Sequence, residues 1–449
     1  MPQDSQPALC FATLKGKKVQ ADFDGGTVTS DAGALLLRAV DRHTGLVDRL
    51  VGALRDWRDP RYIVHALGDL VRQRLFQIAL GYEDADDADA LRCDPALKTA
   101  CERLPMTGAD LASQPTLSRL ENKVSRPQLL RLAYALGDAF IASFPTPPRQ
   151  LLLDLDDTDD PVHGAQQLAL FNAHYGEYCY QPLHVYDGLT GRLITTVLRP
   201  GATPKGEDIV KILQRVVARL RRAWPQVQIL VRGDSHFSAP EVHAFCRDHG
   251  LWFILGQGTN PTLRAAVAPT LAQAQALLAA APQPQTIRLF TQFDYQARTW
   301  AQPLRVVAKV EVSPLGDNVR FVVTNCRTGR PSFLYGQGYA GRGAMENYIK
   351  NHKTFLHSDR TSCHRFEANQ FRLLLHSAAY MLLRSLQELF LYGTQLQQAY
   401  FDTLQQRLLK VGARVVERAT VIRFHLPTSF PLQHLYRLID TRLQPAAPQ

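Results

Sequence analysis

The spacing of apolar residues changes once along the chain, near residue 147. Before that point apolar side chains return every three or four positions, which is typical of amphipathic helices. The first such run contains Leu35, Leu36, Leu37, Val40 and Leu46. A proline-rich linker, FPTPPRQ over residues 144–150, closes this region. The pattern predicts an α-helical domain over residues 1–146.

Beyond the linker, short apolar runs alternate with helical patterns. The run that begins at Leu151 and the run over residues 228–231 predict strands, and both stop in charged residues that include aspartates. Residues 181–199 predict a hairpin with glycines in its turn, and residues 209–224 predict an amphipathic helix with a basic outer face. This alternation predicts an α/β core whose sheet is covered by helices.

Three further strand-like runs follow a stretch that is rich in alanine, glutamine and proline. They cover residues 286–295, 304–312 and 319–324, and we interpret them as a β-rich insertion in the α/β core. The predicted divisions are an α-helical N-terminal domain (1–146), the first part of the core (147–260), the insertion (261–335), the end of the core (336–392) and a C-terminal region of helices and strands (393–449).

Composition narrows the class of protein. The chain has 449 residues, of which 45% are apolar and 20% are charged, as in ordinary soluble globular proteins. Its formal net charge of +10 favours polyanionic partners. The seven cysteines are never spaced CxxC, which indicates reduced thiols in a cytosolic protein. The sequence has no signal-peptide pattern and no uninterrupted apolar stretch of about 18 residues, so we expect no membrane span.

Carboxylates gather where the predicted strands end. Asp154 and Asp156 alternate onto one face of the first strand and its exit, whereas Asp157 points to the other face. Asp234 ends a second strand of the same core. Ligand-binding side chains of α/β enzymes lie at such strand ends, where they face the crevice beyond the sheet. For each aspartate alone, helix capping or turn formation is an equally good explanation.

A short stretch near residue 346 supplies a further carboxylate. In the sequence YAGRGAMENYIKNHK, the residues Tyr339, Arg342, Glu346 and Lys353 have helical directions of roughly 0°, 300°, 340° and 320°. A continuous helix would place one carboxylate among a phenol and two cations on a narrow face. The two glycines beside Arg342 leave room for the helix to begin only there, with Tyr339 on the preceding loop. The alternative is a solvated helix face with ordinary charge pairs.

Together, Asp156, Asp234 and Glu346 form a set of hard oxygen donors from three separate elements. So few protein ligands suit Mg²⁺ or Mn²⁺, which keep open positions for water and substrate phosphates. Two such ions about 4 Å apart activate the attacking oxygen and stabilise the leaving oxygen during displacement at phosphorus. The conjunction of the three acids therefore predicts metal-dependent phosphoryl transfer.

Residues 107–125 contain a candidate helix-turn-helix. A short helix, a turn over residues 113–115 and a second helix from about Thr116 would form this motif. Gln114, Thr116, Ser118 and Arg119 would then lie at the end of the second helix that reads base edges. Pairs of short polar helices also occur in proteins that never bind DNA, so both interpretations stay open.

The acidic triad and its surroundings resemble a known family. Asp156, Asp234 and Glu346, with the tyrosine, arginine and lysine spaced around the glutamate, resemble the DDE transposases of bacterial insertion sequences. The stretches DLDDTDDPVHGAQ, PLHVYDG, VRGDSHF and GYEDADDADALR and the terminal helical block are most similar to the thirteen-eighty family, with its Tyr-Arg-Glu-Lys signature. The resemblance runs from about Phe23 to Phe424. It implies a ribonuclease-H-like catalytic core with a β insertion before the third acid, and a helical N-terminal domain that helps to recognise terminal inverted repeats.

The resemblance also implies a role for each matching residue. Asp156 matches the first acid, because Thr158 completes the family's Asp-any-Thr pattern. Asp234 matches the second acid and Glu346 the third, which makes these three the implied catalytic and metal-binding residues. The extra carboxylate at Asp157 departs from the small residue expected there, and it leaves ambiguity among the three neighbouring aspartates.

Three residues around the glutamate match the rest of the signature. Tyr339, Arg342 and Lys353 correspond to the residues that are expected to contact DNA phosphates near the cut. A nucleophilic role for Tyr339 is the alternative, but its place beside Arg342 better fits a hydrogen-bond donor to phosphate. Within the insertion, Trp300 is either a platform for a base flipped from the duplex end or an ordinary sheet aromatic.

The implied reaction has two steps. Water hydrolyses the phosphodiester at the end of the element and leaves a 3′-hydroxyl, which then attacks a phosphodiester of the target DNA. The implied partners are double-stranded transposon ends and target DNA, with a homodimer in the DNA complex, and the implied location is the cytoplasm, with nucleoid association when DNA is bound. The alternatives are a ribonuclease-H-like, structure-selective nuclease and a transposase-derived DNA-binding protein that has lost catalysis.

Overall fold

A computed structural model describes residues 8–202 and 204–444. The chain divides into two compact units. The first unit comprises residues 1–43, 58–118 and 385–449, and the second comprises residues 44–57 and 119–384. Segments from the predicted N-terminal domain and from the C-terminal region thus belong to one unit. The domain boundaries proposed from the sequence stay predictions.

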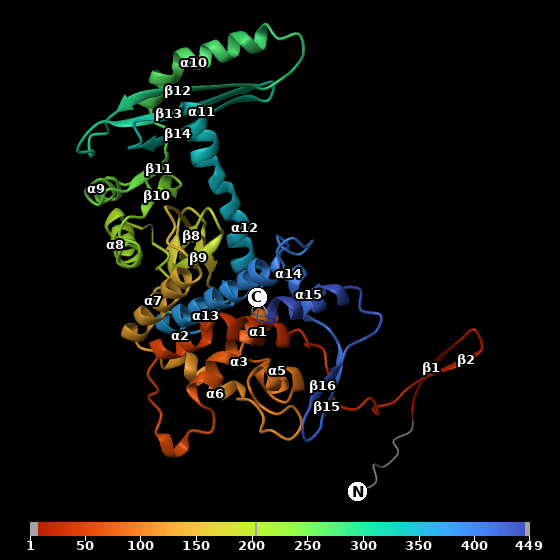
Figure 1. The fold of residues 1–449 in the computed structure, drawn as a ribbon. Helices are drawn as coiled ribbons and strands as arrows, with labels where there is room; N and C mark the ends of the chain where they lie inside the picture. Colours follow the sequence, from red (N-terminus) through yellow and green to blue (C-terminus); the bar gives the residue numbers. More distant parts are fainter. Residues whose placement is uncertain (1–7, 203, 445–449) are drawn as a thin grey trace, which may run out of the picture. The chain divides into compact units, whose positions relative to one another are not determined.

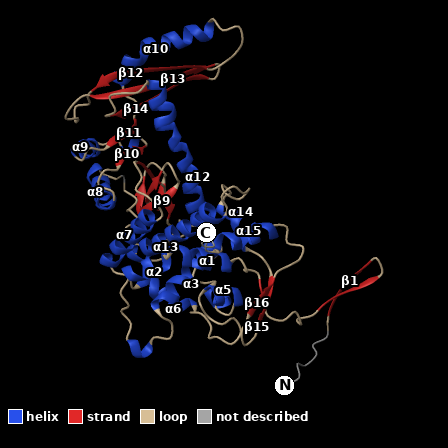
Figure 2. Cartoon of the chain, in the orientation of Figure 1, coloured by secondary structure: helices blue, strands red, loops and turns tan. Residues whose placement is uncertain are grey.

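An eight-stranded mixed sheet organises the second unit (Figures 1 and 2). Its three central strands run parallel: β4 (Gln150–Asp157), β10 (Gln228–Gly233) and β11 (Trp252–Gln257). Next to β4 the antiparallel strands are β8 (Leu183–Asp187) and β9 (Arg192–Val197). Next to β11 they are β14 (Gly316–Thr324), β13 (Leu304–Ser313) and β12 (Ile287–Tyr295). The mixed sheet confirms the predicted α/β class, and the strands predicted over the insertion extend this same sheet.

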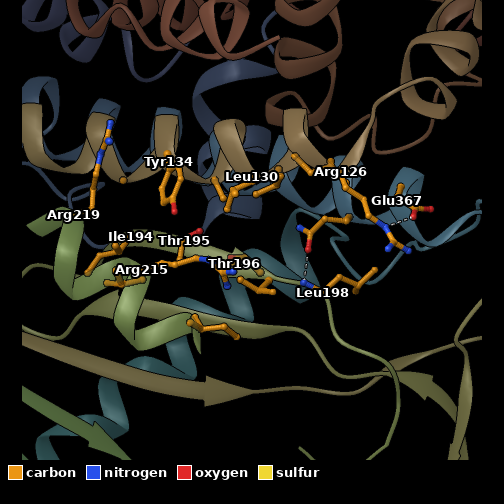
Figure 3. A pocket seen from close by; sticks show the side chains of 18 of the residues that line it. Arg126, Leu130, Tyr134, Ile194, Thr195, Thr196, Leu198, Arg215, Arg219 and Glu367 are labelled. Carbon is orange, nitrogen blue, oxygen red and sulfur yellow. Dashed lines mark hydrogen bonds and ion pairs between the residues drawn. The ribbon is translucent and has the colours of Figure 1, made fainter. Parts of the chain in front are cut away.

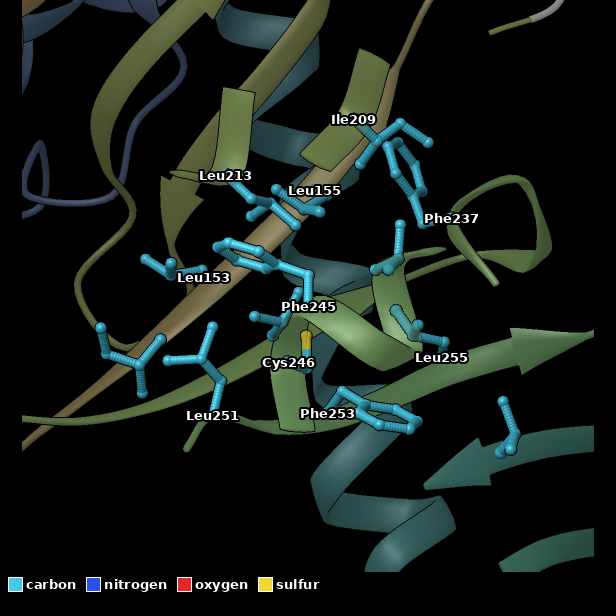
Figure 4. Packing of buried hydrophobic residues seen from close by; sticks show 14 of the residues in the cluster. Leu153, Leu155, Ile209, Leu213, Phe237, Phe245, Cys246, Leu251, Phe253 and Leu255 are labelled. Carbon is cyan, nitrogen blue, oxygen red and sulfur yellow. The ribbon is translucent and has the colours of Figure 1, made fainter. Parts of the chain in front are cut away.

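Four helices pack against one face of the sheet and enclose its main apolar core. They are α7 (Arg126–Ala142), α8 (Gly206–Ala223), α9 (Pro240–Asp248) and α10 (Pro261–Ala279). Leu153 and Leu155 of β4 point into this core, where they join Leu213 of α8 (Figure 4). Because side chains alternate along a strand, Asp154 and Asp156 face the opposite side of the sheet. The alternation of apolar and acidic residues along β4 therefore places Asp154 and Asp156 on the side of the sheet away from this core.

A helical rod over residues 331–355 packs on that opposite face (Figure 1). It begins with α11 (Pro331–Phe333), continues through a π-helix (Leu334–Tyr339) and a 3₁₀ turn (Ala340–Gly343) to α12 (Ala344–Lys350), and ends in a second π-helix (Asn351–Phe355). Leu334 and Tyr335 pack against Ile254 of β11. The Nε2 atom of His352 lies 3.1 Å from the hydroxyl of Ser377, which belongs to the long helix α13 (Phe366–Ser385).

The rod corrects one expectation from the sequence. Tyr339 belongs to a helical turn and not to a loop before the helix. The glycine-rich sequence of the rod is compatible with this mixture of π and 3₁₀ turns. Such turns contain different numbers of residues from an α-helical turn. The directions calculated for a regular helix therefore do not hold along the whole rod.

The insertion contains a helix that the sequence pattern did not predict. Helix α10 occupies the stretch rich in alanine and glutamine, both of which favour helices. The side chain of Asn260 caps its start by accepting a hydrogen bond of 2.9 Å from the backbone nitrogen of Leu263. Buried Leu263 and Val267 then attach α10 to the core of the sheet.

Two short segments complete the second unit. The helix α2 (Leu46–Ala53) packs against α7. A small three-stranded sheet follows β4 and consists of β5 (Asp160–Pro161), β6 (Leu170–Asn172) and β7 (Glu177–Tyr180).

The first unit joins helices from both ends of the chain. Its elements are β1 (Leu9–Leu14), β2 (Lys17–Ala21), β3 (Val28–Thr29), α1 (Ala34–Thr44), α3 (Leu67–Ala79), α4 (Ala88–Leu91), α5 (Pro95–Ala100), the start of α6 (Gln114–Asn122), α14 (Phe401–Leu404), β15 (Ala413–Glu417), β16 (Ile422–His425) and α15 (Gln433–Leu443). Gly33 packs so closely that a Cβ atom there would lie 2.3 Å from the Cα of Leu409. Lys410 forms an ion pair of 2.8 Å with buried Asp31. These contacts attach the start of the chain to its C-terminal segment.

The predicted helix-turn-helix is wrong in its first half. Residues 101–113 form turns and extended backbone, and α6 begins at Gln114. Gly108 closes a single turn on Leu104, whose carbonyl oxygen accepts a hydrogen bond of 3.2 Å from the Gly108 nitrogen, and the chain does not continue this turn as a helix. The next helix after α6 is α7, which begins with a capping box formed by Ser125 and Gln128.

Candidate active site

The register between β4 and β10 brings two of the predicted acids side by side. Asp154 is opposite Arg232 in this parallel pair, so Asp156 and Asp234 each lie two residues further along, at the same edge of the sheet. Neighbouring strands lie about 4.8 Å apart. The two carboxylates affect one another, because the charge of Asp234 raises the pKa of Asp156. The predicted meeting of these two acids is therefore present in the structure.

Asp156 lies in an environment that disfavours its charge. Burial is the main cause that raises its pKa, to about 6, and the positive charge of Arg342 opposes this rise. The Nη2 atom of Arg342 lies 2.9 Å from Oδ2 of Asp156, and the two side chains are 17% and 16% exposed. The pKa of Asp156 stays raised because the positive charge of Arg342 offsets only part of the cost of burying the ionised carboxylate.

The other two aspartates of β4 are held in buried ion pairs. Asp154 accepts two hydrogen bonds from Arg232, from Nε at 2.6 Å and from Nη2 at 2.7 Å. Asp157 accepts a hydrogen bond of 2.7 Å from Nη2 of Arg199. Asp156 is also paired with a guanidinium, that of Arg342, but of the three aspartates it is the one that the strand register places level with Asp234.

Tyr339 and Lys353 approach the same end of the sheet from the rod. The hydroxyl of Tyr339 lies against Gly256, where a Cβ atom would be 2.8 Å from it, and burial raises the pKa of this phenol. Lys353 donates to the carbonyl oxygen of Asp159 and lies 3.2 Å from its Oδ1. Tyr339 thus lies against strand β11, and Lys353 contacts the loop that follows Asp156.

Glu346 is the exception. It lies in the first turn of α12, one helical turn beyond Arg342, and its side chain is exposed. Within residues 8–202 and 204–444 its side chain has no hydrogen bond or ion pair. No group of three or more His, Cys, Asp or Glu side chains in this described part is placed to hold a metal ion. The three acids therefore do not converge in this structure.

His236 is a neighbour of the site that sequence reasoning did not single out. Its Nδ1 lies 3.4 Å from Oδ1 of Asp157 and 3.8 Å from Oδ2 of Asp234. The hydrogen bond that the His236 ring makes to the carboxylate of Asp157, which accepts it, is the main cause that raises the pKa of His236. The signal in the sequence was the unexpected Asp157 together with a histidine two positions after Asp234.

The residues predicted to read base edges lie at the start of α6. The side chain of Gln114 donates to Asp86 at 3.3 Å, and its backbone nitrogen donates to Asp89 at 3.1 Å. The hydroxyl of Thr116 lies 3.4 Å from the hydroxyl of Ser113, and Arg119 is exposed. Of the four predicted residues, Gln114 and Thr116 therefore make contacts within the protein that serve the helix start.

Neither Trp300 nor the apolar cavity of about 470 Å³ lies in the group of acids. Trp300 lies between β12 and β13, is only 8% exposed and packs edge-on against Tyr295 and His243 in the apolar core, where it is no platform for a flipped base. The cavity lies between α7, α8 and β9, where Tyr134 and Ile194 point into it (Figure 3). It is lined mainly by apolar side chains that the chemistry above does not need.

Comparison with known proteins identifies the family. The profile of the family described as Transposase DDE domain group 1 matches residues 11–448. The chain belongs to this DDE transposase family. Membership indicates polynucleotidyl transfer in general, with DNA as the substrate class. A comparison with curated proteins found no match.

One solved structure gives a weaker similarity. The piggyBac transposase in a synaptic complex with hairpin DNA matches with a TM-score of 0.40 and 11% sequence identity, over 93% of this chain and 86% of that chain. We transfer no residue and no role from that structure to this chain.

DDE transposases generally use divalent metal ions. The aspartate pair fits such an ion, because Asp156 and Asp234 offer hard oxygen ligands side by side and the raised pKa of Asp156 marks a site short of positive charge. Glu346 does not belong to the pair in this structure.

Two expectations from composition concern the rest of the chain. All seven cysteines are free thiols, as predicted. No helix in the described residues is long and apolar enough to cross a membrane.

Proposed function

We propose that this chain is the transposase of a bacterial insertion sequence of the thirteen-eighty family, which binds the terminal inverted repeats and catalyses metal-dependent DNA cleavage and strand transfer. The observation that carries the proposal is the matched position of Asp156 and Asp234 at the ends of two neighbouring parallel strands. Within a family of DDE transposases, such a carboxylate pair is suited to phosphoryl transfer.

The order of the strands supports a ribonuclease-H-like core. Strands β9, β8 and β4 form an antiparallel meander, and β10 and β11 follow β4 in parallel. We assign the core to these five strands, with the helices that connect them, and the insertion to α10 and β12–β14. In this assignment the insertion separates the second acid from the third, as the resemblance implies.

Asp156, Asp234 and Glu346 are the proposed catalytic and metal-binding residues. When bound, Mg²⁺ or Mn²⁺, as two ions, would supply Lewis-acid stabilisation of the attacking and leaving oxygens. Asp156 and Asp234 would hold these ions with their carboxylates, and burial of the Asp156 side chain, which is 16% exposed, would limit the access of bulk water to it. Glu346 would have to turn toward the pair from its exposed position on α12.

The cations of the rod are the proposed phosphate ligands. Arg342 is paired with Asp156 at 2.9 Å, so its guanidinium would lie beside a phosphodiester bound at the aspartate pair. A DNA phosphate would compete for this guanidinium and would free Asp156 for the metal. Lys353 would bind another DNA phosphate after leaving Asp159. The hydroxyl of Tyr339 would donate a hydrogen bond to a phosphate oxygen of the same DNA strand.

The proposed reaction needs no covalent intermediate with the protein. Water attacks the phosphodiester at the transposon end, the bond to the 3′-oxygen breaks, and a 3′-hydroxyl is released. In the second step this hydroxyl attacks a target phosphodiester and displaces the target's own 3′-oxygen. A homodimer on the DNA would bring two transposon ends together.

The experiment is an assay of cleavage and joining in Mg²⁺ with a labelled duplex that carries the terminal inverted repeat. The proposal predicts specific cutting at the repeat and joining of the released 3′-end to target DNA. Cutting without end specificity or joining would identify a structure-selective nuclease. Binding to the repeat without any cutting, for the wild type in Mg²⁺ and in Mn²⁺, would identify a catalytically inactive DNA-binding protein.

A further inference from the structure

The hairpin β1–β2 near the N-terminus pairs with no other strand among the described residues (Figures 1 and 2). Every residue from 9 to 26 is exposed. A two-stranded hairpin on its own is only marginally stable in water, so a partner surface would be expected to complete it. We call residues 9–21 the hairpin arm.

The arm has one apolar face. Leu9 is opposite Ala21 and Phe11 is opposite Val19 in the antiparallel register. Opposed residues, and residues two apart on one strand, share a face. Leu9 and Phe11 expose 49% and 58% of their surface, which is unusual for side chains gathered on one face.

The tip of the arm is basic. Lys15, Lys17 and Lys18 surround the turn, and residues 8–21 contain no acidic residue. Lys15 and Gly16 have φ angles of 50° and 81°, so both central residues of the turn are in the left-handed region. Turns of this type favour Asn, Asp or Gly at the first of these positions. A lysine there costs conformational energy, which a functional role for its charge would explain.

We propose that the hairpin arm is a DNA-binding element that follows a groove of duplex DNA, with its lysines on the flanking phosphates. A two-stranded β-ribbon fits the major groove, and apolar side chains of minor-groove proteins pack between bases. Duplex DNA therefore accounts for both the basic tip and the apolar face. A second copy of this chain would accept only the apolar face, because each arm carries three lysines and each chain a net charge of +10.

This inference rests on the proposed function only in taking DNA as the partner. The test is the salt dependence of binding to a duplex, between about 50 and 200 mM salt, since each phosphate contact contributes about 0.9 to the slope of log K against log salt. The arm variant carries Lys15→Asn, Lys17→Gln and Lys18→Gln, in which asparagine keeps the turn. We expect its slope to be shallower by about 2 to 3.

The matched control removes the same charge elsewhere. It carries Arg61→Gln, Arg247→Gln and Arg288→Gln, three exposed cations that are each paired with a nearby acid, Asp59, Asp248 and Glu311. We expect its slope to stay within about 0.5 of the wild-type slope. Equal slopes for the arm variant and the control would overturn the proposal. The proposal would also be overturned if the arm variant changed the monomer–dimer equilibrium but bound DNA with the same salt slope as the wild type.

Two further variants separate this inference from the proposed function. Phe11→Ser should weaken binding at every salt concentration without a change in slope, because it alters the apolar face alone. Asp234→Asn should bind DNA with the full wild-type slope, because its arm is intact. If the wild type binds with an arm-dependent slope but neither cuts nor joins DNA, the arm stands and the proposed function falls. If it cuts and joins and the arm variant keeps the full slope, the arm proposal is overturned and the proposed function stands.

Discussion

Three aspartates within four residues of β4 show how the partner of a carboxylate decides its role. Asp154 and Asp157 neutralise buried arginines, whereas Asp156 meets Asp234 and Arg342 at the edge of the sheet. The alternation of the strand predicted the shared face of Asp154 and Asp156. It could not predict their partners, because Arg232 lies on β10 and Arg342 lies on the rod, both far along the chain.

Substitution of the two aspartates that share a face should affect stability in different ways. Asp154→Asn leaves Arg232, which is 3% exposed, without its charge partner, so we expect a loss of about 3 kcal/mol in the free energy of unfolding. Asp156→Asn removes a carboxylate whose pKa is raised to about 6, and its partner Arg342 is 17% exposed and can be hydrated, so at pH 7.5 we expect stability to be unchanged or increased. Urea unfolding of both variants checks this. An equal loss in the two variants would contradict the distinction between them.

The proposed phosphate-binding role of the rod cations predicts an effect on DNA affinity. Replacing Arg342 or Lys353 with glutamine should each make the salt slope of binding shallower by about 1, because one phosphate contact is lost. Arg247→Gln is the control, since this exposed cation is paired with Asp248. A slope unchanged from that of the control would show that these cations serve only Asp156 and Asp159.

At the scale of elements, hydrophobic patterns predicted what local periodicity can determine. The β8–β9 hairpin, helix α8 and the strands β10, β12, β13 and β14 all lie where the apolar spacing placed them. The rod did not follow its pattern, because π and 3₁₀ turns rotate side chains away from the directions of a regular helix. That is one physical reason why Glu346 does not lie with the acids it was expected to join.

The rod carries a pH sensitivity of its own. His352 is fully buried between Ser358 and Ser377, and burial lowers its pKa to about 3. As pH falls below about 6.5, the unfolded chain takes up a proton that the folded protein excludes until about pH 3. Stability should therefore fall with decreasing pH, by about 1.4 kcal/mol per pH unit from this residue alone.

Comparison of His352→Gln with His163→Gln, the substitution of an exposed histidine, checks this pH sensitivity. Urea midpoints at pH 7 and pH 5 should differ less in His352→Gln than in the wild type, and His163→Gln should behave as the wild type. An unaltered pH dependence in His352→Gln would mean that this histidine is not held neutral.

At the scale of the whole molecule, long-range contacts decide the organisation. Gly33 packs on Leu409 and Lys410 pairs with Asp31, so both ends of the chain contribute to one unit. No periodicity within a window of the sequence reports such contacts, and the sequence therefore separated the N-terminal and C-terminal regions. The match to the family profile, by contrast, covers residues 11–448, and it supports the transposase chemistry that the scattered acids suggested.

Asp156, Asp234 and Glu346 are proposed to act as one site, and Glu346 is its most exposed member. The most direct measurement is cleavage of terminal-repeat DNA in Mg²⁺ by Glu346→Gln, compared with Glu207→Gln, which alters an exposed glutamate in the first turn of α8. We predict a loss of at least about a hundredfold for Glu346→Gln, with unchanged DNA binding, and wild-type cleavage for Glu207→Gln. Cleavage by Glu346→Gln at the wild-type rate would contradict the claim.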